Sequence, residues 1–181
     1  MMRSAIFLSI IICFCMGYSV AHTQNTPLEV REQWKKNKGI SIVIFLKEEC
    51  PICQKYAPTL RDIYRRFSAD SVRFLGVFSD RTPDSLAIRK YCRVYSIPFP
   101  VLIDSTMALA EYTDARITPE AAVIVNGRVV YKGRIDDWFI SWGRKRNAPR
   151  HHTLIEVLNN LLSGRPIQEP VTQAIGCAIS R

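Results

Sequence analysis

The sequence has no internal repeat and no low-complexity segment, and it has few residues of the metal-binding or cross-linking types. Its 181 residues include six cysteines and three histidines. A structural zinc site needs a second Cys/His pair beside Cys50 and Cys53, and His151-His152 lacks the usual spacing. Covalent haem attachment needs a histidine directly after Cys53, where Gln54 stands. The sequence therefore predicts no metal ion and no cofactor.

Long apolar runs are also absent, apart from one at the N-terminus. The run from Ala5 to Met16 is short for a membrane-spanning helix and lies close to the terminus. Arg3 precedes it, and the small-x-small pattern Ser19-Val20-Ala21 follows it. Together they predict a signal peptide over residues 1–21, with an uncleaved anchor as the alternative. We therefore expect a periplasmic or otherwise exported protein that meets the membrane only through this signal.

Acidic residues are outnumbered by basic ones, with 16 Asp and Glu against 25 Lys and Arg. The basic residues concentrate at Arg144-Lys145-Arg146 and Arg150, and near Lys35. A nucleic-acid surface is one interpretation of such a patch. For an exported protein, a solvated face or attraction to an anionic membrane surface is favoured, and no nucleic-acid partner is expected.

The remaining chain alternates apolar, β-branched runs with helical patterns. Ile40 to Leu46 is typical of a central strand that is buried on both faces. Asn126-Gly127 is a strong signal for a two-residue hairpin turn. Strands are expected at 40–46, 72–78, 100–104, 121–125 and 128–135, and helices at 28–38, 50–67, 82–95, 105–112 and 151–162. In the third of these helices, Thr82 is expected to be the cap and Pro83 to take the first helical position.

This order predicts an α/β fold with a central mixed sheet and helices on both faces. The early strand–helix–strand crossovers predict parallel pairing, and the hairpin predicts an antiparallel edge. Residues 22–164 are expected to form one domain, followed by an extended tail over 165–181. Trp138 and Trp142 are four residues apart, which predicts that they share one helical face.

Cys50 and Cys53 carry the strongest chemical signal. Their Cys-x-x-Cys spacing places Cys50 at the start of a helix and Cys53 one turn later, within reach of a disulfide. The unpaired N–H groups and the positive dipole end of the helix favour a thiolate at Cys50. That thiolate would attack a substrate disulfide, and Cys53 would then resolve the mixed disulfide. Glu48 and Glu49 act in the opposite direction, because neighbouring carboxylates raise a thiol pKa.

The segments Phe45 to Cys53, Thr118-Pro119-Glu120 and Asn126-Gly127 resemble the thioredoxin-like superfamily. More narrowly, the chain is similar to the bacterial envelope redoxins, the TlpA/ResA and AhpC/TSA-like thiol–disulfide group. The resemblance implies a thioredoxin-like fold with an extra strand–helix insert at 100–112. It also implies a redox-active Cys50–Cys53 disulfide and a cis Pro119 beside it. Pro51, Thr118 and Pro119 would bind the substrate.

Two further segments, 131–137 and 171–179, resemble a redoxin subgroup often found beside cytochrome-type domains. The resemblance implies that the partners are protein thiols or disulfides, with an envelope electron donor or cytochrome protein as a further candidate. Gly176-Cys177 matches this subgroup, which suggests a third redox thiol at Cys177. A resolving thiol on a flexible tail, a metal ligand and a cysteine without a role are the alternatives.

The chain also departs from these families. Glu49 replaces the aromatic residue usual before the first cysteine, and Pro51-Ile52 replaces Gly-Pro. Peroxiredoxins have proline and threonine where Val43 and Lys47 stand, which disfavours a thiol peroxidase. The leading hypothesis is a thiol–disulfide oxidoreductase of the cell envelope, and a copper-binding or metal-delivery module and a thiol peroxidase are the alternatives.

Three other features have simpler interpretations. Cys92 lies in a helical pattern and is expected to be a buried core thiol. Asp136 and Asp137 are expected to cap a helix, with proton transfer as the alternative. His151 and His152 are expected to be surface residues.

Overall fold

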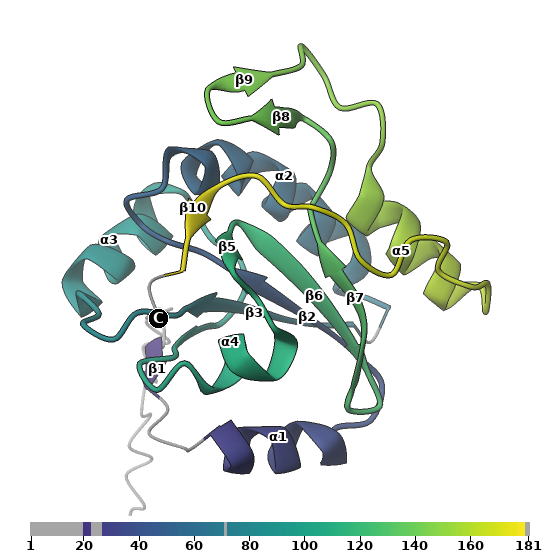
Figure 1. Cartoon of the computed structure of the whole chain (residues 1–181), viewed down its shortest axis with the longest axis horizontal. Helices are drawn as coiled ribbons and strands as arrows, with labels where there is room; N and C mark the ends of the chain where they lie inside the picture. The colour runs from purple at the N-terminus through teal and green to yellow at the C-terminus, as the bar shows by residue number, and fades with distance from the viewer. Residues whose placement is uncertain (1–19, 23–26, 71, 180–181) are drawn as a thin grey trace, which may run out of the picture.

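The computed structural model describes residues 20–22, 27–70 and 72–179, so the predicted signal peptide lies mainly outside the described residues. A six-stranded sheet in the order β1-β4-β3-β2-β6-β7 forms the centre (Figure 1). The first four of these strands run parallel to one another. Strand β6 runs antiparallel to its neighbour β2, and β7 runs antiparallel to β6. The strands are β1 (Val20–His22), β2 (Ile40–Phe45), β3 (Arg73–Phe78), β4 (Val101–Ile103), β6 (Glu120–Val125) and β7 (Arg128–Gly133).

Helices cover both faces of this sheet, as predicted. Alternate residues of β2 point to opposite faces, so Ile42 and Ile44 join one apolar cluster and Val43 and Phe45 join the other. The first cluster packs against α2 (Pro51–Phe67), α3 (Ser85–Val94) and α5 (Thr153–Leu162). The second packs against α1 (Pro27–Lys36), through Trp34, and α4 (Ala108–Thr113).

The hairpin and the insert were also predicted correctly. Asn126 and Gly127 both have positive φ, 48° and 74°, between the antiparallel strands β6 and β7. In the insert, β4 pairs with β3, and α4 follows it. The buried carboxylate of Asp104 fixes α4 by accepting hydrogen bonds from the N–H groups of Leu109 and Ala110, at 3.1 and 3.0 Å.

The C-terminal tail pairs with the domain at two points along its length. Val171 forms an isolated parallel bridge with Lys132 of β7. Further on, β10 (Cys177–Ala178) pairs antiparallel with β5 (Ile117–Thr118). Figure 1 shows this segment in yellow, running from α5 past β7 to β5. Backbone hydrogen bonds therefore hold the tail at both points.

Three local predictions are wrong. Trp138 and Trp142 do not share a helix, because they flank β8 (Phe139–Ser141), which pairs with β9 (Arg144–Lys145). Gly143, with φ of 74°, makes the turn between these strands. The third helix is capped by Asp84, which accepts hydrogen bonds from the N–H groups of Leu86 and Ala87, and not by Thr82. Pro83 therefore lies before the cap, and Ser85 takes the first helical position.

The sheet edge opposite the hairpin was not predicted. It is β1, which pairs parallel with β4, and the predicted cleavage point before His22 falls within this strand. Among the described residues, none of the helices is both long and apolar enough to cross a membrane.

Candidate active site

The Cys-x-x-Cys motif lies at the junction of a buried strand and a long helix, as predicted. Cys50 is the N-cap residue of α2, with an extended backbone, and Pro51 occupies the first turn. The carbonyl of Cys50 accepts the N–H of Gln54 at 3.1 Å, which begins the helix. Proline is tolerated here because the first N–H groups of a helix have no intrahelical partner. Cys53 follows one turn into α2, on its buried face.

Hydrogen bonds from neighbouring thiols decide the charge state of Cys50. They lower its pKa to about 5, with the thiol of Cys53 as the largest cause and the thiol of Cys177 as a further one. Burial opposes this shift, while the backbone N–H groups of Cys53 and Cys177 support it. Burial, followed by the neighbouring Cys50, raises the pKa of Cys53 well above its ordinary value. The site therefore holds one thiolate, at Cys50, supported by two protonated thiols.

The loop that contains Pro119 lies against this thiolate. The Thr118–Pro119 peptide bond is cis, as the resemblance implied. In its protonated form, the thiol of Cys50 donates to the carbonyl of Thr118 at 3.3 Å. When Cys50 ionises, it can no longer donate, and it accepts from the thiols of Cys53 and Cys177 instead. The structure therefore brings Cys50, Cys53 and Pro119 together.

Glu120 fixes the same loop, and sequence reasoning did not identify this role. The side chain is buried, and one carboxylate oxygen accepts the N–H groups of Arg116 and Ile117 at 2.8 and 3.2 Å. Arg116 directly precedes β5, Ile117 is its first residue, and Glu120 follows Pro119. The carboxylate therefore closes the loop on itself, which holds Thr118 beside Cys50.

Cys177 reaches the site from the other end of the chain. It is the residue of β10 that pairs with Thr118, and the hydroxyl of Thr118 donates to its carbonyl at 3.2 Å. Burial, followed by the neighbouring Cys50, raises the pKa of Cys177 to about 12. The described cysteines carry free thiols, and three of the four converge on one loop.

Cys92 is the remaining described cysteine. It is buried on α3 within the main apolar cluster, as predicted, and burial raises the pKa of its thiol to about 11. Within residues 20–22, 27–70 and 72–179, no group of three or more His, Cys, Asp or Glu side chains is arranged to hold a metal ion.

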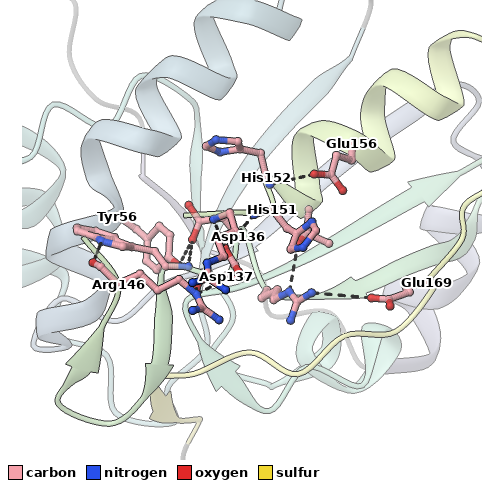
Figure 2. A network of polar contacts seen from close by, with 12 residues as sticks. Tyr56, Asp136, Asp137, Arg146, His151, His152, Glu156 and Glu169 are labelled. Carbon is pink, nitrogen blue, oxygen red and sulfur yellow. Dashed lines mark hydrogen bonds and ion pairs between the residues drawn. The ribbon is translucent and has the colours of Figure 1, made fainter. Parts of the chain in front are cut away.

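A polar network lies behind the site, one helical turn beyond Cys53. The hydroxyl of Tyr56 on α2 donates to the buried carboxylate of Asp136 at 2.5 Å (Figure 2). The N–H of Trp138 donates to the same oxygen at 2.9 Å. Burial raises the pKa of Asp136. Burial also raises the pKa of Tyr56, and the hydrogen bond to Asp136 and the Asp136 charge act in the same direction. A small pocket lined by Tyr56, Asp136 and Pro119 connects this network to the site.

Asp137 extends the network toward α5. It accepts the N–H groups of Arg150 and His151 at 2.6 and 3.0 Å. It also pairs with Arg146 at 3.1 Å, and Figure 2 shows Asp137 between Arg146 and His151. Burial opposes ionisation, but these donors outweigh it and lower the pKa of Asp137. The expectation that Asp136 and Asp137 cap a helix is therefore wrong, because both bind loop N–H groups. His151 and His152 are exposed, as predicted.

Comparison with known proteins supports the family resemblance. Residues 17–132 match the family model described as the AhpC/TSA family. A curated relative, the thiol-disulfide oxidoreductase ResA of Bacillus cereus, is 26% identical over 117 residues, which are 64% of this chain. The chain spans 65% of the length of that relative.

Two solved structures share the fold. An uncharacterised conserved protein from Geobacillus kaustophilus aligns with a TM-score of 0.69 at 24% identity, over 81% of this chain and 79% of its own. A thioredoxin-like protein, solved in its oxidised form, aligns with a TM-score of 0.54 at 17% identity, over 75% of this chain and 84% of its own. The predicted thioredoxin-like α/β fold is therefore confirmed.

Proposed function

Because this chain belongs to the AhpC/TSA family, we propose that it is a thiol–disulfide oxidoreductase whose redox-active pair is Cys50 and Cys53. The observation that carries the proposal is the position of the Cys50 sulfur. It lies at the N-terminus of α2, hydrogen-bonded to the next cysteine of the motif and to the carbonyl that precedes cis Pro119. The name of the ResA relative agrees with this activity.

The reaction follows from the unequal pKa values of the two thiols. The Cys50 thiolate attacks one sulfur of a substrate disulfide, which forms a mixed disulfide and releases the other substrate sulfur as a thiolate. The Cys53 thiol then loses its proton and attacks the Cys50 sulfur. This step forms the Cys50–Cys53 disulfide and releases the second substrate thiol. Two electrons pass from the protein pair to the substrate, and the reverse sequence oxidises a substrate dithiol.

The substrate-binding residues would be Pro51, Thr118 and Pro119. Pro51 is exposed at the N-terminus of α2, next to the buried Cys50. Thr118 belongs to a two-residue strand whose edge already pairs with another strand, β10. An extended protein segment can bind in the same way, through backbone hydrogen bonds, and it would have to displace β10 to pair with Thr118. We therefore expect an extended protein segment that carries a disulfide as the substrate.

The envelope is the proposed location. This part of the proposal rests on the predicted signal peptide. It agrees with the proposed activity, because protein disulfides persist in an oxidising compartment outside the cytoplasm. An envelope electron donor or a cytochrome protein would supply or remove the electrons. Processing is tested by expressing the full chain in a bacterial host and sequencing the N-terminus of the exported product. A chain retained whole in the cytoplasm would contradict the location.

Turnover of a small disulfide substrate tests the activity. The background is the full chain with Cys13→Ser and Cys15→Ser, which leaves four cysteines and is called the four-cysteine protein below. We expect Cys50→Ser to abolish turnover, and the matched control Cys92→Ala, at a buried cysteine outside the motif, to retain it. Equal turnover by Cys50→Ser and the parent would refute the assignment. Peroxide consumption or retained copper without disulfide exchange would favour the peroxidase or metal-delivery alternative.

A further inference from the structure

The pairing of β10 with β5 places a third sulfur against the proposed nucleophile. Cys177 lies directly opposite Thr118, whose carbonyl accepts the thiol of Cys50 at 3.3 Å. The thiol and the backbone N–H of Cys177 also lie close enough to the Cys50 sulfur to lower the pKa of Cys50. Cys50 therefore has two thiol neighbours, Cys53 on its own helix and Cys177 on the tail.

Close backbone contacts fix the position of Cys177. A side chain at Gly176 would place its Cβ 2.0 Å from the carbonyl oxygen of Thr118, so only glycine allows β10 to approach this closely. On the other side of the cysteine, the N–H of Ile179 donates to the carbonyl of Arg116 at 2.9 Å. The tail is thus held on both sides of Cys177, within the reach of the site.

A second anchor lies earlier in the tail. Thr172 is buried, and its N–H donates to the carbonyl of Lys132 at 3.0 Å. Its hydroxyl hydrogen-bonds to that of Tyr131 at 2.7 Å. A Cβ at Gly133 would lie 2.2 Å from the carbonyl oxygen of Thr172, which again requires glycine. Three residues separate Thr172 from Gly176, so the path of the tail from this anchor to the site is short and defined.

Accessibility distinguishes the three sulfurs. Cys50 and Cys53 are each 0% exposed, whereas Cys177 is partly exposed at the surface. Of these three cysteines, Cys177 is therefore the one with surface that solvent reaches.

We propose that Cys177 is a third redox-active thiol, which forms a disulfide with Cys50 in alternation with Cys53. This inference rests on the proposed function, because it takes Cys50 as the nucleophile. In the mixed disulfide between Cys50 and substrate, Cys177 loses its proton and attacks the Cys50 sulfur. The Cys50–Cys177 bond forms, and the substrate sulfur leaves as a thiolate that takes up a proton.

The alternative disulfide then returns to the motif by exchange. Cys53 loses its proton and attacks the Cys50 sulfur of the Cys50–Cys177 bond. The Cys50–Cys53 disulfide forms, and Cys177 leaves as a thiolate that is protonated again. This exchange is redox-neutral for the protein. Across both steps, one substrate disulfide gains two electrons, and two protein thiols lose them.

Peptide mapping in the four-cysteine protein tests the proposal directly. Trypsin separates the three regions into residues 48–55, 91–93 and 151–181, which carry Cys50 with Cys53, Cys92 and Cys177 respectively. In the Cys53→Ser variant, mild oxidation should link 48–55 to 151–181. The matched control Cys53→Ser with Cys92→Ala should give the same linked peptide, and Cys53→Ser with Cys177→Ser should give none.

Trapping of a mixed disulfide gives a second, kinetic readout. With a small disulfide substrate, Cys53→Ser should lose its mixed disulfide as Cys177 resolves it, whereas Cys53→Ser with Cys177→Ser should retain it. We expect retention to increase by about tenfold or more, because a neighbouring thiol on the same chain reacts at a high effective concentration. The four-cysteine protein with limiting oxidant should also yield some of the linked peptide, which tests the native pair without a substitution in the motif.

The outcomes separate this inference from the proposed function. If Cys53→Ser and the double variant trap the mixed disulfide equally, and the linked peptide is absent from all samples, Cys177 is not a redox thiol and the inference is wrong. The proposed function would stand in that case, because Cys50 still formed the trapped species. If neither variant traps a mixed disulfide and the parent shows no turnover, the proposed function itself fails.

Discussion

Replacing Cys177 with alanine should raise the pKa of Cys50 and make the Cys50–Cys53 disulfide harder to reduce. The reason is that the tail thiol and its backbone N–H stabilise the Cys50 thiolate, and the substitution removes the thiol donor alone. A hydrogen bond to a charged group contributes about 1.5–3 kcal/mol, and one pKa unit corresponds to about 1.4 kcal/mol. The pKa of Cys50, which is about 5 in the parent, should therefore rise by about one to two units.

The reduction potential should change in the same experiment. A stabilised thiolate favours the reduced form of a cysteine pair, so its loss favours the disulfide. For a two-electron couple, about 1.4 kcal/mol corresponds to about 30 mV, which predicts a potential lower by about 30–60 mV. The Cys177→Ser variant is the matched control, because its hydroxyl can still donate and should preserve most of both values.

The pKa can be measured from the pH dependence of alkylation in the four-cysteine protein, with residues 48–55 followed by mass spectrometry. Cys53→Ala should raise the Cys50 pKa more than Cys177→Ala does, since the thiol of Cys53 is the larger cause. The reasoning is refuted if Cys177→Ala leaves both the pKa and the potential unchanged while the protein remains folded by circular dichroism.

Three further substitutions probe the loop, the network and the tail. Glu120→Ala should destabilise the fold by about 1–3 kcal/mol for each N–H group that loses its acceptor, whereas Glu120→Gln should preserve most of the stability in urea unfolding. Equal losses of stability in the two variants would contradict the role of the Glu120 side-chain oxygen as the acceptor of these N–H groups. Asp136→Asn should raise the melting temperature at neutral pH and not in acid. The pKa of Asp136 is higher in the folded than in the unfolded protein, so the folded protein loses stability as the pH rises through the folded pKa. Asparagine does not ionise and therefore removes this loss. A difference in melting temperature between Asp136→Asn and the parent that does not change with pH would contradict a raised pKa at Asp136. Gly176→Val should displace β10 from Thr118 and reduce the yield of the Cys50–Cys177 linked peptide, but leave the Cys50–Cys53 disulfide intact; an unchanged yield would show that the close contact is not required.

The central part of the fold could be predicted because its signals are local. The β-branched run before Cys50 and the Asn126-Gly127 turn each specify their structure within a few residues. The β8–β9 hairpin could not be predicted in this way. The four-residue spacing of Trp138 and Trp142 coincides with a helical repeat, but a turn at Gly143 with positive φ gives the same spacing in a hairpin.

The site was predicted in part for a related reason. The cysteine motif and Pro119 are recognisable from their own neighbours in sequence. The contact between Cys177 and Cys50 depends on pairing across 59 residues, from Thr118 to Cys177, and no local pattern encodes it. The buried acceptor roles of Glu120 and Asp136 are likewise set by burial and by donors that the fold brings to them.

Equilibration of the four-cysteine protein with glutathione buffers of increasing oxidising strength tests the redox pair most directly. Residues 48–55, released by trypsin after alkylation of free thiols, report the state of Cys50 and Cys53 in a single peptide. We predict that this peptide loses two hydrogens as one internal disulfide forms, and regains them when the buffer is made reducing. A peptide that remains a dithiol, or that carries only glutathione, across the whole range would contradict the assignment of Cys50 and Cys53 as a redox-active pair.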